Sequence, residues 1–264
     1  MDHLLNYNRY NREEIVQPLS LYQIEHISQY LNVINPVAYN GGLELFILEH
    51  VKSRIHRWLT SPHEDTIWIE RSATGIRSPL PQQTLEAIYA KKLCDHAGIV
   101  NVSYFYSLRR LVLHDQPGPS KREMLLDMVR SIISQLAYSF LPSVIYTDID
   151  LSIERFQRVA NPGVDINTAI SLMRDVRSFA PPYINCIIEG LEKIEDPYDL
   201  RHTNDIVTTL HHLAYHASEL VSNVLPGERL TAKTVRACFT SDGNVAALVY
   251  MVTHGSAARV PYLE

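Results

Sequence analysis

Four short apolar runs alternate with longer segments of helical periodicity, and this alternation constrains the fold more than any other feature. Short continuous apolar runs bounded by polar residues are typical of strands buried on both faces. Strands that take turns with helices form a parallel sheet covered by helices. We therefore predict an α/β fold with a doubly wound, mainly parallel sheet. The predicted strands are Thr66–Glu70, Asn101–Tyr106, Ile184–Glu189 and Val235–Thr240.

Apolar residues at helical spacing predict the segments that connect these strands. The stripe from Met124 to Leu136 is the widest, and it indicates a core helix rather than a cofactor site. Further helices are predicted over Ile166–Phe179 and Thr203–Val221, each followed by proline residues. We expect two parts in the chain, an N-terminal helical extension over residues 1–41 and an α/β domain over residues 42–264.

Composition excludes several classes of protein. Hydrophobic residues make up 46% of the 264 residues and charged residues 20%, as in ordinary globular proteins. The net charge of -5 and the lack of a basic run argue against nucleic acid as a partner. No apolar segment approaches the roughly 18 residues that a membrane span needs. Three separated cysteines with apolar neighbours, Cys94, Cys186 and Cys238, predict reduced, buried thiols, so we expect a cytoplasmic protein without membrane contact.

The loop after the first predicted strand has the frame of a phosphate-binding loop but lacks its glycines. Such a loop follows the pattern G-x-x-x-x-G-K-[ST], in which glycines let backbone amides surround phosphate while Lys and a hydroxyl contact phosphate and Mg²⁺. The four diagnostic positions hold Arg71, Ile76, Arg77 and Ser78. Only the hydroxyl is kept, with Arg in place of Lys. The pattern predicts a nucleotide-binding fold whose chemistry is weakened.

Two acidic residues follow the third predicted strand. Glu189 ends the apolar run and Glu192 lies just beyond it, so both are expected at the carboxyl edge of the sheet. In phosphate-loop enzymes an acid at this position holds Mg²⁺, and a second acid positions the attacking water. The fourth predicted strand ends at the same edge with Ser241, Asp242 and Gly243.

The order of these segments resembles the NACHT/STAND-type P-loop NTPase domains, and in particular a set found in filamentous fungi. The similarity covers roughly residues 42–244 and rests on order and spacing. The matching pieces are Arg57-Trp58-Leu59-Thr60-Ser61-Pro62 before Trp68-Ile69-Glu70, Ala97 through Phe105, Arg130 through Leu136, Ile187-Ile188-Glu189-Gly190-Leu191-Glu192, and Cys238-Phe239-Thr240-Ser241-Asp242-Gly243.

The resemblance implies a site for ATP or GTP with Mg²⁺. It places nucleotide contacts at Thr74, Gly75, Arg77 and Ser78, the metal at Ser78 and Glu189, and a catalytic role at Glu192 if the domain is active. Departures from the family pattern are Arg71 and Ile76 for glycine, Arg77 for Lys, Glu189 for Asp, and Asp242 for an Arg.

Two functions compete on these residues. The first is a degenerate NACHT/STAND-like module that regulates or binds a protein partner or another copy of itself, with weak or no hydrolysis. The alternative is a signalling ATPase or GTPase that still uses Arg77, Ser78, Glu189 and Glu192 with Mg²⁺. A β-branched Ile where close backbone approach is needed costs about 1–2 kcal/mol, which favours the first function.

Two further patterns bear on the site. Pro79 and Pro81 predict that the helix after the loop begins only near Pro81, away from the phosphate position. Four histidines suggest a metal site, but no Glu lies between His212 and His216 as an H-E-x-x-H motif requires, so a partly exposed helix is expected. The four are His202, His211, His212 and His216.

Overall fold

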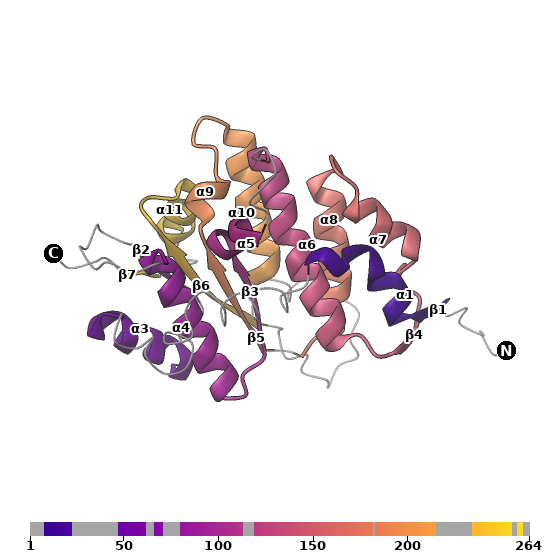
Figure 1. Ribbon diagram of the computed structural model, residues 1–264, viewed down its shortest axis with the longest axis horizontal. Coiled ribbons are helices and arrows are strands. Elements are labelled where there is room, and N and C mark those ends of the chain that lie inside the picture. The colour runs from indigo at the N-terminus through magenta and orange to yellow at the C-terminus, as the bar shows by residue number, and fades with distance from the viewer. Residues whose placement is uncertain are drawn as a thin grey trace, which may run out of the picture. The chain divides into compact units, whose positions relative to one another are not determined.

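The computed structural model describes residues 8–22, 47–61, 66–70, 80–112, 119–181, 183–214, 234–254 and 258–260. Contacts divide the chain into two compact units, each built from two separate stretches of sequence (Figure 1). The first unit consists of Met1–Ile24 and Glu123–Pro181, and the second consists of Glu25–Arg122 and Pro182–Glu264. The predicted boundary between residues 41 and 42 lies outside the described residues.

A five-stranded sheet with the order β3-β5-β6-β2-β7 forms the centre of the second unit, and each pair of neighbouring strands is parallel. The prediction of a parallel α/β sheet is therefore confirmed. The ends of the four predicted strands differ from the observed ends by at most one residue, and β7 was not predicted. The strands are β2 Thr66–Glu70, β3 Asn101–Phe105, β5 Tyr183–Glu189, β6 Thr234–Ser241 and β7 Ala258–Val260.

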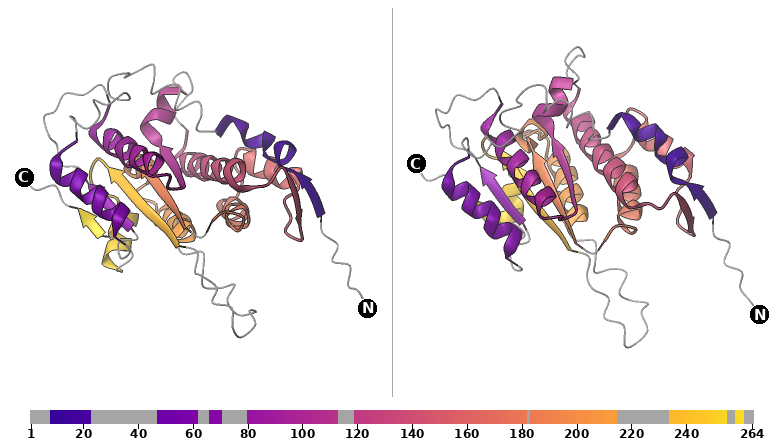
Figure 2. Two further views of the ribbon diagram at one scale, coloured as in Figure 1. Left: turned by 90° about the horizontal axis from the view of Figure 1, so that it is seen from below. Right: turned by 60° about the horizontal axis from the view of Figure 1, so that its bottom comes forward.

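Helices flank this sheet. The helix α4 packs against β3, β5 and β6, whereas α10 contacts β6 and α11. Figure 2 shows α4 and α10 on opposite faces of the sheet, an arrangement compatible with a doubly wound fold. The helices of this unit are α3 Glu49–Thr60, α4 Gln82–His96, α5 Tyr106–Val112, α9 Leu191–Ile194, α10 Leu200–Ala214 and α11 Ala246–Thr253. Residues 215–221 of the predicted helix Thr203–Val221 lie outside the described part of the chain.

A partly buried arginine side chain joins β6 to the end of α3. Arg236 donates from Nη2 to the carbonyl of Ser61 at 2.8 Å and from Nη1 to that of Leu59 at 3.2 Å. Its guanidinium carbon lies 5.6 Å from the centre of the Trp58 ring. The last carbonyls of a helix lack partners within the helix, so this side chain satisfies the end of α3.

The first unit combines a two-stranded antiparallel sheet with a cluster of helices. Strand β1 pairs with β4 so that Tyr10 lies opposite Ile145. The predicted helix over Met124–Leu136 is confirmed within α6, and the one over Ile166–Phe179 is confirmed as α8, which ends two residues earlier, at Arg177. In contrast, β1, β4, α1 and α7 were not predicted. The elements are β1 Asn8–Asn11, α1 Arg12–Val16, η1 Gln17–Tyr22, α6 Lys121–Phe140 from Glu123 onward, β4 Val144–Thr147, α7 Ile153–Ala160 and α8 Ile166–Arg177.

Arg130 forms a buried polar connection inside the first unit. The residue is 1% exposed, and its Nε and Nη2 donate to the carbonyls of Val159 and Asn161, each at 2.8 Å. Its Nη1 forms an ion pair with Glu123 on the same helix. Arg130 belongs to a segment that carries the family resemblance, and here it fastens α6 to the C-terminal end of α7.

Among the described residues, no helix is both long enough and apolar enough to cross a membrane.

Candidate functional site at the carboxyl edge of the sheet

In the sheet of the second unit, the strand order reverses, and ligands commonly bind at such a position. Strand β2 lies between β6 and β7, while β3, the next strand of this sheet along the chain, lies at the opposite edge. In open α/β sheets, ligands bind outside the carboxyl ends of the strands where the order reverses. In the register of the sheet, Glu70 pairs with Ser241, and Glu189 pairs with both Phe105 and Thr240.

The predicted phosphate-loop residues Thr74, Gly75, Arg77 and Ser78 lie outside the described residues, as do Arg71 and Ile76. The chain is described again from Leu80. The helix α4 begins at Gln82 with Pro81 as its N-cap, and the amide of Leu85 donates to the Pro81 carbonyl at 3.2 Å. The prediction that this helix starts near Pro81 is therefore confirmed.

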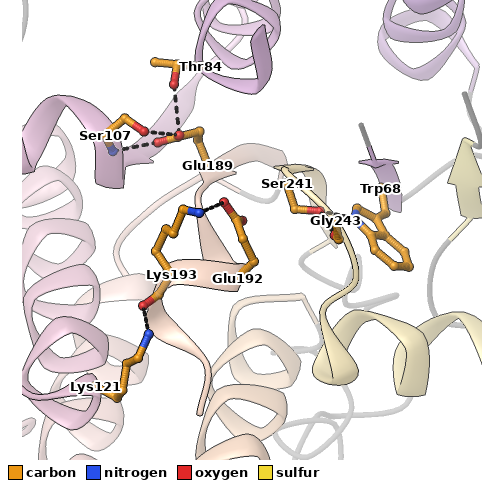
Figure 3. A network of polar contacts seen from close by, with 9 residues as sticks. All are labelled: Trp68, Thr84, Ser107, Lys121, Glu189, Glu192, Lys193, Ser241 and Gly243. Carbon is orange, nitrogen blue, oxygen red and sulfur yellow. Dashed lines mark hydrogen bonds and ion pairs between the residues drawn. The ribbon is translucent and has the colours of Figure 1, made fainter. Parts of the chain in front are cut away.

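Glu189 lies at the end of β5, as predicted, and it is fully buried. Its carboxylate accepts hydrogen bonds from the Ser107 amide at 2.9 Å, the Ser107 hydroxyl at 2.6 Å and the Thr84 hydroxyl at 2.9 Å (Figure 3). Burial raises the pKa of Glu189, and the hydrogen bonds from Ser107 and Thr84 oppose that rise. The side chain thus joins β5 to α4 and α5 through donors of the chain itself.

Gly190 turns the chain from β5 into the short helix α9. Its φ of +86° lies in the left-handed region, where residues with a Cβ are strained. A Cβ at this position would lie 2.7 Å from the Cβ of Tyr106, the first residue of α5. The missing side chain lets α5 and the end of β5 approach closely, which places Ser107 within reach of Glu189.

Glu192 lies in α9, just beyond the strand as predicted, and its side chain is 8% exposed. Neither carboxylate oxygen accepts a hydrogen bond of normal geometry from the described residues, and the nearest cation is Lys193 Nζ at 3.9 Å. The pKa of Glu192 is raised from 4.5 to about 7, mainly by burial; the Glu189 charge also raises it, whereas the Lys193 charge and the amides of Glu192 and Asp242 lower it. A carboxyl of this kind can take up or release a proton near neutral pH.

The end of β6 is fixed to β2 by a hydrogen-bonded serine. The Trp68 indole Nε1 donates to the Ser241 hydroxyl at 2.8 Å, and that hydroxyl donates to the carbonyl of Gly243 at 2.8 Å (Figure 3). The exposed residue Asp242 lies in this turn, where the family resemblance would place an Arg.

Sequence reasoning missed the role of Glu195, the residue that follows α9. Glu195 is 5% exposed, and its carboxylate accepts from the amides of Ala246 at 2.7 Å and Ala247 at 2.9 Å. These amides belong to the first turn of α11, where backbone donors have no partner within the helix. Because 51 positions separate Glu195 from Ala246, no local sequence signal could reveal this cap.

The described histidines and cysteines do not gather into a metal site. His202 is buried, and its Nε2 donates to the carbonyl of Ile194 at 2.9 Å, while His216 lies outside the described residues. Within the described ranges, no group of three or more metal-binding side chains comes together. The predicted reduced thiols are confirmed, since Cys94, Cys186 and Cys238 are free and buried.

We expect the Glu192→Gln variant to be more stable than the wild-type protein above pH 7. The folded-state pKa of Glu192 is raised, so its protonated form adds stability below pH 4.5, and that contribution is lost as the pH rises to about 7. Glutamine stays neutral, and the expected gain in unfolding free energy is about 2 kcal/mol in alkaline buffer. Urea unfolding at several pH values, with Glu154→Gln as an exposed control, measures the difference. Parallel stability curves for the Glu192 variant and the wild type would contradict the assignment.

Comparison of the chain with models of protein families, with curated proteins and with solved structures gave no match.

Proposed function

We propose that the second unit is a degenerate NACHT/STAND-like P-loop domain that acts as a regulatory or protein-interaction module, with weak or no nucleotide hydrolysis. The parallel sheet with its reversal of strand order supports a fold of this kind. The free, buried cysteines fit a reducing compartment, so the proposal places the protein in the cytoplasm.

The environment of Glu189 is the observation that carries this proposal. Mg²⁺ requires near-ideal octahedral geometry, and it is commonly held by one or two carboxylates with open positions for water and phosphate oxygens. The Glu189 carboxylate is fully buried and already accepts three hydrogen bonds, two from Ser107 and one from Thr84. These donors occupy three of the roughly four lone-pair sites of a carboxylate, so the acid serves better as a connection between elements than as a metal ligand.

The start of α4 gives independent support. In a phosphate loop the amides at the beginning of the following helix point at the phosphate. Here α4 begins at Gln82 behind the N-cap Pro81, four positions after Ser78, and the Thr84 amide donates to the Pro81 carbonyl at 3.1 Å. Proline itself has no amide to offer. The first free amides of this helix are therefore displaced along the chain from the position that the phosphate pattern requires.

Exposed apolar side chains fit a role in binding protein. Tyr198 and Leu200, between α9 and the start of α10, are 96% and 77% exposed. The Asp196 carboxylate accepts from the Tyr198 amide at 3.0 Å, and the Asp199 carboxylate accepts from the Arg201 amide at 2.9 Å. These bonds hold the turn in one conformation, which lowers the entropy lost when a partner binds. The partner in this proposal is another protein or a second copy of the chain.

Titration of the purified protein with fluorescent ATP and GTP analogues and Mg²⁺ tests the loss of nucleotide chemistry. We expect no saturable binding in the micromolar range and no phosphate release above background, because glycines are missing from the loop and Glu189 is occupied by the chain's own donors. Phosphate release and fluorescence anisotropy give the two readouts.

The Arg77→Ala variant separates specific from adventitious binding, and Arg158→Ala, which removes an exposed arginine of the first unit, is the matched control. Micromolar affinity that Arg77→Ala abolishes and Arg158→Ala preserves would overturn the proposal. That outcome would favour the signalling ATPase or GTPase.

A further inference from the structure

The helix α9 carries a largely buried acid, Glu192, and is followed directly by a buried one, Glu195, and the two have opposite environments. Glu192 has no hydrogen-bond donor of normal geometry among the described residues, whereas Glu195 accepts from both Ala246 and Ala247 of α11. We propose that α9 is a proton-operated switch, in which loss of the Glu192 proton displaces α9 and releases Glu195 from the first turn of α11. The inference goes beyond the proposed function, because it holds whether or not a nucleotide binds.

Among the described residues, a negative charge on Glu192 has little compensation. The surrounding groups contribute charges of both signs, and the nearest described cation, Lys193 Nζ, is at 3.9 Å, which is too far for a hydrogen bond. A largely buried carboxylate that is stabilised only by two poorly aligned amides and one ammonium group at 3.9 Å is unfavourable, so the charged side chain is driven toward water. The titratable or charged groups around it in the described part of the chain are Glu189 of β5, Lys193 of α9, Asp242 after β6, Tyr106 and Arg110 of α5, and Lys121 of α6, whose Nζ donates to the Lys193 carbonyl.

The helix α9 is short enough to transmit this movement. It spans four residues, from Leu191 to Ile194, between the left-handed Gly190 and its C-cap Glu195. The Glu195 amide donates to the Leu191 carbonyl at 2.9 Å, and the Lys193 amide donates to the Gly190 carbonyl at 3.0 Å. One hydrogen-bonded turn thus connects Glu192 to Glu195. In this switch, the turn moves as a whole against the contacts of the buried Leu191 and Ile194, and the movement that brings Glu192 to solvent also moves the carboxylate that caps α11.

The switch changes the hydrogen bonding at the N-terminus of α11. The N-cap residue Val245 offers no side-chain hydrogen bond, so Glu195 is the side chain that satisfies the first amides of the helix. A carboxylate at a helix N-terminus also interacts favourably with the helix dipole. When Glu195 withdraws, the Ala246 and Ala247 amides become accessible to water, and their exchange with solvent accelerates.

The direction of the response follows from the chemistry of Glu192. Burial holds its pKa at about 7, so the side chain is neutral in mildly acidic solution and charged in alkaline solution. The switch is therefore closed at low pH, with Glu195 on α11, and it opens as the pH rises through neutrality.

Amide hydrogen exchange measured by NMR at about pH 5.5 and about pH 8, after correction for intrinsic exchange rates, tests the switch in the full chain. In the wild-type protein we expect the protection factors of Ala246 and Ala247 to fall about tenfold at the higher pH. In Glu192→Gln they should stay within about twofold, because the amide mimics the neutral acid. In Glu195→Gln, protection of both amides should be reduced at both pH values, because a carboxylate acceptor is lost.

The exposed Glu154→Gln variant serves as the matched control and should reproduce the wild-type pH response. The proposal is overturned if the wild-type protection factors are independent of pH. It is also overturned if Glu192→Gln loses protection as the wild type does, since another group would then control α11. A ¹³C NMR titration of the Glu192 carboxyl gives a second measurement that needs no variant. A titration midpoint near the ordinary pKa of glutamate would contradict the proposal.

Discussion

Replacement of Gly190 by alanine should lower the free energy of unfolding of the second unit by about 3 kcal/mol. Two effects add at this position. The φ of +86° is strained for any residue with a side chain, and the new Cβ would lie 2.7 Å from the Cβ of Tyr106. The contacting atom belongs to the base of a side chain and has no rotamer that removes it. Urea denaturation followed by circular dichroism measures the loss.

Gly98 provides the matched control for this substitution. Its φ of +64° is also in the left-handed region, but no atom lies within 4 Å of the position that a Cβ would take. Gly98→Ala should therefore cost only about 1 kcal/mol, the backbone contribution alone. Equal losses in the two variants would contradict the close packing of α5 against Gly190.

The Arg130→Leu substitution should destabilise the first unit by about 3 kcal/mol. Leucine keeps the apolar volume near the helix axis but removes the donors to the Val159 and Asn161 carbonyls, and it leaves Glu123 without its cation. Buried acceptors that lose their donors cost more than a surface contact that is lost. Denaturant-dependent hydrogen exchange in α6 and α8 reports on this unit specifically.

Arg122→Leu is the control for Arg130, since Arg122 is an exposed arginine in the first turn of the same helix. We expect a change within about 0.5 kcal/mol, as is usual for surface substitutions. If the two variants were equally stable, Arg130 would not hold α7 against α6.

The elements that could be predicted from the sequence are those whose buried residues form a continuous apolar run or a regular apolar period. The strands β2, β3, β5 and β6 are apolar because helices cover them, and the long stripe of α6 has a clear helical period. β1 was missed because its residues, Asn-Arg-Tyr-Asn, are mostly polar and exposed. β7 has only three residues, with Arg259 in the middle, and it belongs to the sheet through its pairing with β2.

In the candidate site, the positions of Glu189 and Glu192 followed from the end of an apolar run. Their surroundings did not, because the donors to Glu189 come from Thr84 and Ser107, which are 105 and 82 positions away. Neither residue has an unusual local pattern. Long-range contacts of this kind depend on the crossover of α4 over the sheet, which periodicity alone does not specify. The nucleotide, metal and partner assignments stay predictions.

The first unit is built from two distant stretches of sequence, and this determines when its contacts can form during translation. Arg12 donates to the carbonyl of Leu141, 129 positions later, so the segment around Arg12 leaves the exit tunnel long before its counterpart is synthesised. Likewise, β2 must wait for β6. Closing such long loops costs conformational entropy, and the stabilising contacts form only after the loop has closed. Nascent chains should therefore stay partly open until β6 has been translated, and chaperones that shield apolar strands would have the most to contribute before that point.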